Sequence, residues 1–207
     1  ARQPTFDERE VERERGRQLD DLRSRDDRPA SVAFELFAKT LYRVHPYRLS
    51  MLGEAEPLRA VGPGTLREFH ARHLDPSRLT LAVVGDVDVE AVLRAAERDF
   101  GAAPPRADVG PPVPVEPPLD GPRTARKQLQ KAQSHLVLGF LGARVSDPWR
   151  RALEVLSTLL SGQSGRLFLE LRDKQSLCYS VSSMSVEGVD PGYFALYLAT
   201  SPEKVAQ

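Results

Sequence analysis

The two residues best suited to chemistry lie seven positions apart, in the C-terminal half of the chain. Arg172 falls on a short helix expected at about 165–175, and Tyr179 falls at the start of the strand expected next. An arginine and a tyrosine that converge from a helix end and a strand start supply two hydrogen-bond donors, one of them permanently charged. Together they could hold a carbonyl oxygen or a developing oxyanion. The alternative is structural, because arginines that cap carbonyls and tyrosines on a sheet face are common, and the residues alone leave both open.

For the other candidate sites, the sequence favours a structural role over a functional one. Gly162 and Gly165 could bind an anion at a helix start, but a tight turn between helices explains them as well. His70 and His73 could share a metal, yet no third ligand lies near them in the sequence. Cys178 is the single cysteine, which excludes an internal disulfide and favours a buried, inert thiol.

The composition excludes several classes of protein. Lysine plus arginine and aspartate plus glutamate each number 29, and this zero net charge does not suggest a nucleic-acid or anionic-membrane binder. The longest apolar run, 136–143, is too short for a membrane span, and no signal peptide is visible. We therefore expect a soluble protein of unknown compartment. The absence of Asn and Ile and the excess of Arg over Lys indicate a GC-rich bacterial genome.

The N-terminal half is expected to hold helices and one buried strand. Acids and arginines at helical spacing predict an exposed helix within 5–28, followed by a more apolar helix at 30–43. A further helix is expected within 57–74. Leu79 to Val84 reads LTLAVV, which predicts a buried strand, and Asp88 is expected to open an amphipathic helix that ends near Gly101.

Eight of the twenty residues in 103–122 are proline, which predicts an extended linker and a domain boundary. Beyond it we expect a strand at 133–141 and a helix capped by Asp147–Pro148, with an apolar stripe that stops at Gly162. Residues 177–186 and 193–200 predict a hairpin. Because both ends of the chain fall in or beside helices, we expect a piece of a longer protein.

Several stretches resemble one known family in the right order. Residues 165–181, GRLFLELRDKQSLCYSV, resemble S-R-L-F-x-x-L-R-E-x-x-G-L-A-Y-S-V, the second-domain signature of the insulinase/pitrilysin-type metallopeptidases. His45-Pro46-Tyr47 with Gly53, the run 66–87, the strand 133–140 and Ser161-Gly162 also match the family. The resemblance covers nearly the whole chain.

The resemblance implies an α+β fold, a two-layer antiparallel sheet with helices. It implies that 1–102 is the C-terminal part of a first peptidase-like domain, that 103–125 is the linker, and that 126–207 begins a second such domain. In the family, two domains enclose a cavity in which extended peptides bind. By resemblance, Arg172 and Tyr179 would orient the substrate backbone and support the tetrahedral intermediate.

The departures from the family concern zinc. Active members hold zinc on an HxxEH motif and a distal Glu, and this chain has no HxxEH. Asp21 stands at the distal-ligand position, but we favour a charged helix residue there, and we expect no metal or other cofactor in this fragment.

We expect a zinc-less subunit that binds extended peptide substrates and works with a homologous zinc-bearing subunit or as a homo-oligomer. Alone, this fragment is expected to be inactive. The alternatives are a complete zinc endopeptidase whose HxxEH segment is missing from this chain, and a non-catalytic scaffold or core subunit.

Overall fold

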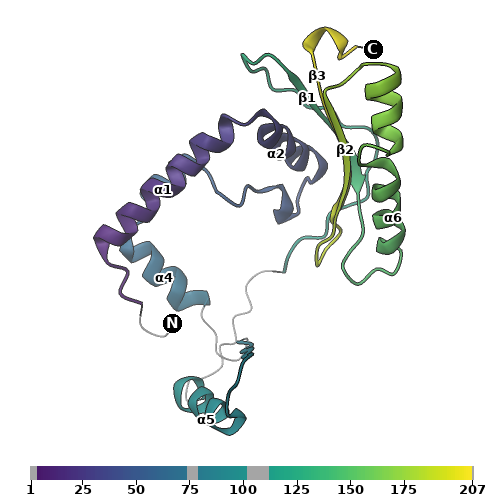
Figure 1. Ribbon diagram of the computed structural model, residues 1–207. Coiled ribbons are helices and arrows are strands. Elements are labelled where there is room, and N and C mark those ends of the chain that lie inside the picture. The colour runs from purple at the N-terminus through teal and green to yellow at the C-terminus, as the bar shows by residue number, and fades with distance from the viewer. Residues whose placement is uncertain (1–3, 74–78, 102–111, 207) are drawn as a thin grey trace. The chain divides into compact units, whose positions relative to one another are not determined.

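The computed structural model describes residues 4–73, 79–101 and 112–206 (Figure 1). The chain divides into two compact units, one made of 1–17 with 56–112 and the other of 18–55 with 113–207. The first part of the predicted linker lies outside the described residues. Among the helices that the structure describes, none has the length and apolar character needed to cross a membrane.

Helices build the first unit. Helix α1 (Glu8–Asp26) begins in it, and α3 (Ala55–Ala60), α4 (Pro63–His73) and α5 (Val89–Phe100) follow. Asp88 caps α5 as predicted, because its side chain accepts the backbone N–H of Ala91 at 3.1 Å. Arg15 ties α1 to the segment after α3 by donating to the Val61 carbonyl at 2.6 Å.

The predicted buried strand at 79–84 is wrong. These residues form no ladder, and Val84 is 99% exposed. A strand is stabilised by backbone hydrogen bonds to a neighbour and by side chains packed on a sheet face. No described segment pairs with 79–84, so the apolar pattern alone does not form a strand here.

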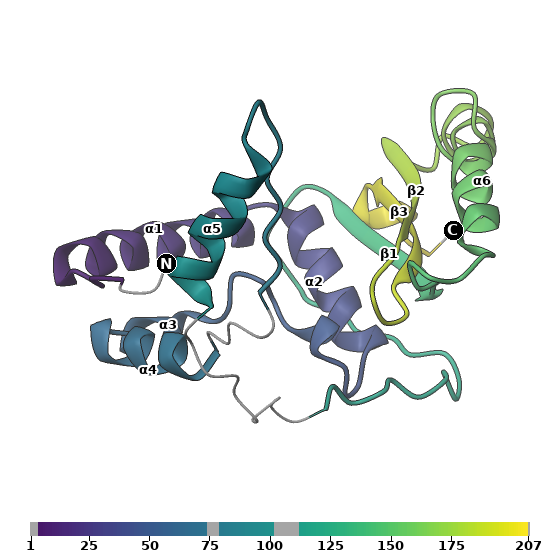
Figure 2. The same cartoon turned by 90° about the horizontal axis from the view of Figure 1, so that it is seen from below.

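The second unit contains an antiparallel sheet of three strands in the order β1-β3-β2. The strands are β1 (Ser134–Leu141), β2 (Ser180–Val186) and β3 (Tyr193–Thr200). The central strand β3 is buried towards both ends, at Phe194 and Ala195 and again at Ala199 and Thr200. Figures 1 and 2 show helix α2 (Pro29–Leu41) on one face of the sheet and α6 (Arg150–Leu160) on the other. This arrangement confirms the α+β class and the predicted hairpin.

Aromatic contacts hold α2 against the sheet. Phe34 stacks on Tyr197 with ring centroids 5.6 Å apart, and Phe37 meets Tyr193 edge-on at 5.3 Å. Gly139 leaves room for this packing, because a Cβ there would collide with the Phe37 ring and the Phe194 carbonyl. The helix therefore fixes one face of β1 and β3.

Helix α6 packs on the opposite face through small polar side chains. Ser161 Oγ accepts the Ser183 N–H at 2.7 Å, and Ser157 Oγ lies 3.2 Å from Ser183 Oγ.

The predicted cap of α6 is wrong. The helix begins at Arg150 without a side-chain cap, because the Asp147 carboxylate turns back to accept the Arg144 N–H. Much of the predicted apolar stripe is exposed, notably at Trp149, Leu156 and Leu159.

The end of α2 is anchored by a buried carboxylate. Glu116 accepts the backbone N–H groups of Arg43, Val44 and His45 at 2.7, 2.9 and 3.0 Å. Burial by itself disfavours the charged carboxylate, but these three donors, helped by the Arg123 guanidinium, hold the pKa of Glu116 below its ordinary value.

Short helical turns complete the second unit. They are η1 (Pro46–Arg48), η3 (Phe168–Lys174, wound as a π-helix) and η4 (Pro202–Lys204). The π-helical turn η3 lies on the segment that resembles the family signature, and it carries Arg172.

Candidate functional site

Arg172 lies near the end of η3 with its side chain exposed. Its guanidinium carbon sits 4.7 Å from the centroid of the Phe168 ring, one turn earlier, in a cation–π contact. No carboxylate among the described residues forms an ion pair with Arg172. The ring therefore steadies the guanidinium without neutralising its charge, which leaves its N–H donors available to an outside acceptor.

The chain leaves η3 through a turn centred on Ser176. The backbone of Ser176 is left-handed, with a φ of 52°, and its N–H donates to the Arg172 carbonyl at 3.0 Å. The next N–H, from Leu177, donates to the Leu171 carbonyl at 2.7 Å. A left-handed residue just past a helix end is the usual way to reverse the chain direction there. In the family signature this position is glycine, which adopts that conformation without strain.

Tyr179 follows this turn and immediately precedes β2. Its backbone N–H donates to the Ala199 carbonyl at 2.8 Å, which ties it to the central strand β3. The residue is 57% exposed. The structure thus places Arg172 and Tyr179 on the surface at the two ends of one turn. Within the described residues, no hydrogen bond or ring contact joins the two groups, so their convergence on one substrate atom remains a prediction.

Cys178 lies between them in the sequence but is buried, with 7% of its surface exposed. Burial raises the pKa of the Cys178 thiol, and the positive charge of Arg172 offsets only part of that rise. A protonated, covered thiol is a poor nucleophile, so this geometry favours the structural role expected for it.

Asp21 stands exposed on α1 beside an ion pair between Asp20 and Arg23 of 2.9 Å. Across residues 4–73, 79–101 and 112–206, no group of three or more His, Cys, Asp or Glu side chains gathers as a metal would require. His70 and His73 on α4 belong to no such group. Whether Asp21 stands at a distal zinc-ligand position therefore stays a prediction.

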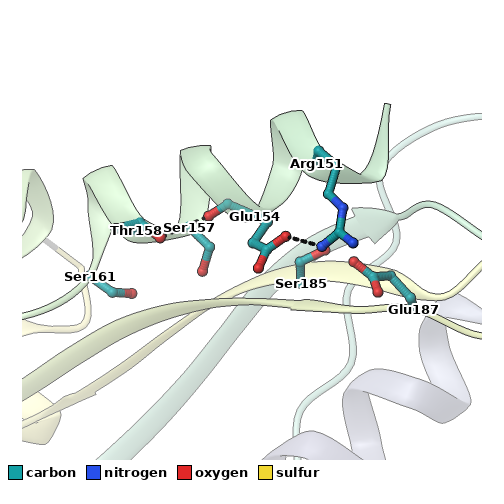
Figure 3. Close-up of a pocket in the computed structure, with 7 residues that line it drawn as sticks. All are labelled: Arg151, Glu154, Ser157, Thr158, Ser161, Ser185 and Glu187. Carbon is teal, nitrogen blue, oxygen red and sulfur yellow. Dashed lines mark hydrogen bonds and ion pairs between the residues drawn. The ribbon is translucent and has the colours of Figure 1, made fainter. Parts of the chain in front are cut away.

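A polar pocket of about 400 Å³ opens between α6 and β2 (Figure 3). It is lined by Arg151, Glu154, Ser157, Thr158, Ser161, Ser185 and Glu187. Arg151 and Glu154 pair with each other at 2.8 Å, and no histidine or cysteine lies in the lining. Ser185 is six residues beyond Tyr179 along an extended strand, or roughly 20 Å away. Neither Arg172 nor Tyr179 lines this pocket, so the pocket gives no support to a role for that pair.

Two polar contacts that shape this unit were not predicted from the sequence. One is Glu116, which binds three backbone donors as described above. The other is the buried His45, whose Nε2 lies 3.1 Å from the Asp190 carboxylate while its Nδ1 accepts the Tyr47 N–H. Both contacts join residues more than 70 positions apart. The local pattern carries no signal for them, except that His45 lies in the HPY segment of the resemblance.

Comparison with known proteins places this geometry in a family. Residues 61–207 match the family described as "Peptidase M16 inactive domain". An uncharacterized zinc protease of Streptomyces coelicolor is 32% identical over 210 residues, covering 96% of this chain and 44% of that relative. The chain thus spans less than half the length of this relative.

Solved structures of similar fold support the same family assignment. The peptidase M16 inactive domain from Pseudomonas fluorescens has a TM-score of 0.78 and 25% identity, covering 97% of this chain and 49% of that one. A protease from Helicobacter pylori has a TM-score of 0.81 and 26% identity, covering 98% and 52%. The resemblance noted in the sequence is confirmed: the chain belongs to the peptidase M16 family, that of the insulinase/pitrilysin-type metallopeptidases, and matches its inactive domain.

Proposed function

We propose that this chain is the substrate-holding part of a zinc-less M16 subunit, which binds extended peptides beside a homologous zinc-bearing subunit. Arg172 and Tyr179 carry the proposal. Both residues are exposed, and both lie at the positions of the family signature. Among the described residues, neither side chain takes part in an internal ion pair or hydrogen bond.

The chemistry assigned to the pair is hydrogen-bond donation to peptide oxygen atoms. The Arg172 guanidinium would bind a backbone carbonyl through charge-assisted hydrogen bonds, and the Tyr179 hydroxyl would donate to the oxygen that becomes negative during attack on the scissile bond. Zinc, held by the partner subunit, would supply the activated water.

Two substitutions in the full-length protein test this proposal. With the zinc-bearing partner present and an unstructured fluorogenic peptide as substrate, Arg172→Ala and Tyr179→Phe should each lower kcat by about 100- to 1,000-fold, the usual effect of losing one oxyanion donor. Arg151→Ala is the matched control, because it removes an exposed arginine that pairs with Glu154 on α6 and lies outside the signature segment. If both substitutions leave turnover at the wild-type rate, the pair is structural and the scaffold alternative holds.

A second candidate is a complete zinc endopeptidase. It is favoured by the name of the Streptomyces relative, a zinc protease of which this chain spans 44%. Under this proposal the same polypeptide carries the HxxEH segment, and Arg172 and Tyr179 act within it. The sequence of the remaining polypeptide distinguishes the two: an HxxEH motif there, with one zinc bound per chain, supports the endopeptidase and contradicts the zinc-less subunit.

A further inference from the structure

We propose that Thr200, assisted by Lys204, is a positioning residue that fixes the turn between Arg172 and Tyr179. This inference rests on the proposed function, because it assigns a purpose to the geometry of that same pair. The turn 175–179 is the covalent link between the π-helical turn that carries Arg172 and the strand that Tyr179 opens. The contacts that fix the backbone of this turn also fix the separation between the backbones of Arg172 and Tyr179, from which the guanidinium and the phenol extend.

The backbone conformation of this turn costs free energy and needs contacts from outside the turn to maintain it. Ser176 is left-handed, a conformation that costs free energy for a residue with a side chain. Such a conformation persists only where neighbouring contacts impose it. The N–H groups of Ser176 and Leu177 are satisfied within η3, as described above, but their carbonyl groups have left the helix and need donors from elsewhere.

Those donors come from the end of β3 and the turn after it. The Thr200 hydroxyl donates to the Leu177 carbonyl, and Lys204 Nζ donates to the Ser176 carbonyl at 2.6 Å. Tyr179 itself is bonded to Ala199, the residue before Thr200. Three successive contacts therefore fasten the turn to one short stretch of chain, residues 199–204.

Thr200 makes the stronger of the two side-chain contacts. It is 2% exposed, so water cannot replace its hydroxyl at the Leu177 carbonyl, and its branched side chain has few rotamers on a strand. Lys204 is partly exposed, and water can substitute for its amine. Removing the Thr200 hydroxyl leaves the partly buried Leu177 carbonyl without this donor, which favours release of the strained backbone at Ser176 and displacement of Tyr179.

The test compares variants of the full-length protein with its zinc-bearing partner, using the unstructured fluorogenic peptide. Thr200→Val should lower kcat about 10- to 100-fold, since a displacement of about 1 Å in a catalytic group has an effect of this size. Thr200→Ser keeps the hydroxyl and should restore most of the rate. Lys204→Met, a surface change that spares the fold, should give a smaller loss, of about 2- to 5-fold.

A second measurement separates positioning from general destabilisation. The Tyr179 amide should exchange with solvent faster in Thr200→Val than in wild type or Thr200→Ser, while the other β3 amides keep their protection. Thr40→Val is the matched control, because Thr40 also donates a partly buried hydroxyl to a carbonyl, at 2.7 Å, but on α2. It should leave both the rate and the Tyr179 exchange unchanged.

These experiments distinguish failure of the positioning role of Thr200 from failure of the proposed function. If Tyr179→Phe slows turnover while Thr200→Val and Lys204→Met behave as wild type, the positioning role is overturned and the proposed function stands. If Arg172→Ala and Tyr179→Phe have no effect, the proposed function fails and the positioning role fails with it.

Discussion

Ser176 adopts a strained backbone conformation, and contacts from neighbouring residues must offset its cost in free energy. Its φ of 52° lies in the left-handed region, where a β-carbon crowds the following carbonyl oxygen. Glycine avoids that contact, although it also loses more conformational freedom when the chain folds. The family signature has glycine at this place, so the serine is a local departure with a measurable consequence.

We predict that Ser176→Gly stabilises the chain by about 0.5–1 kcal/mol, because the relief of strain exceeds the added entropy cost. The free energy of unfolding in urea measures the change. Ser164→Gly is the control, since Ser164 is exposed and has no left-handed backbone. A Ser176→Gly protein less stable than wild type would mean that the serine side chain contributes more than its strain costs.

At the scale of elements, Glu116 links the proline-rich stretch, in which it lies, to the end of α2. The folded-state pKa of this carboxyl lies below the ordinary value of 4.5, through its three backbone donors. A depressed carboxyl pKa stabilises the fold at pH values above the unfolded-state pKa. That stabilisation is lost as the pH falls through the folded-state pKa, because the unfolded chain binds the proton first.

We therefore predict that Glu116→Gln lowers the free energy of unfolding by about 1–3 kcal/mol near neutral pH, as expected for losing hydrogen bonds to a buried charge. The difference from wild type should shrink as the pH falls below about 4.5. Urea unfolding across this pH range measures both effects. Glu154→Gln, which breaks an exposed ion pair with Arg151, should change stability by less than about 1 kcal/mol at any pH. A constant difference down to about pH 3 would contradict the linkage to Glu116.

The elements that could be predicted from sequence are those whose partners lie close along the chain or whose pattern is unambiguous. Helix α5 with its Asp88 cap and the hairpin of β2 and β3 are examples. Elements that depend on distant neighbours were missed or misjudged. The stretch 79–84 has a strand-like pattern but no described partner. The Asp147 error is of another kind, because two local contacts compete: its carboxylate accepts the Arg144 N–H, three residues back, rather than an N–H of α6.

The same distinction applies to the candidate site. Arg172 and Tyr179 were identified from local order, a helix end followed by a strand start, and the structure keeps both side chains exposed. The contacts that shape the turn between them, from Thr200 and Lys204, cross 23 and 28 residues and leave no trace in local spacing. Local sequence therefore points to the two candidate donors but not to the side chains that bond to the turn between them.

For the whole molecule, we predict that the purified 207-residue chain supplemented with zinc does not cleave unstructured peptides. The described residues provide no cluster of metal ligands, and the sequence lacks HxxEH. Peptide cleavage followed by mass spectrometry, with and without a chelator, measures this. The full-length protein with the proposed zinc-bearing subunit is the positive control. Robust cleavage that a chelator abolishes would show that the chain binds zinc through some other set of ligands.

The exposed stretch LTLAVV at 79–84 has a consequence for handling the purified chain. Six apolar or β-branched residues without charge, proline or glycine form the kind of segment that stacks into intermolecular cross-β sheets. Arg78 and Asp86 lie near its two ends in the sequence, and such charges act as gatekeepers that slow self-association through their solvation. The formal net charge of the chain is zero at pH 7, so a buffer pH away from neutrality, which gives every copy the same net charge, is the condition in which the chain should resist aggregation longest.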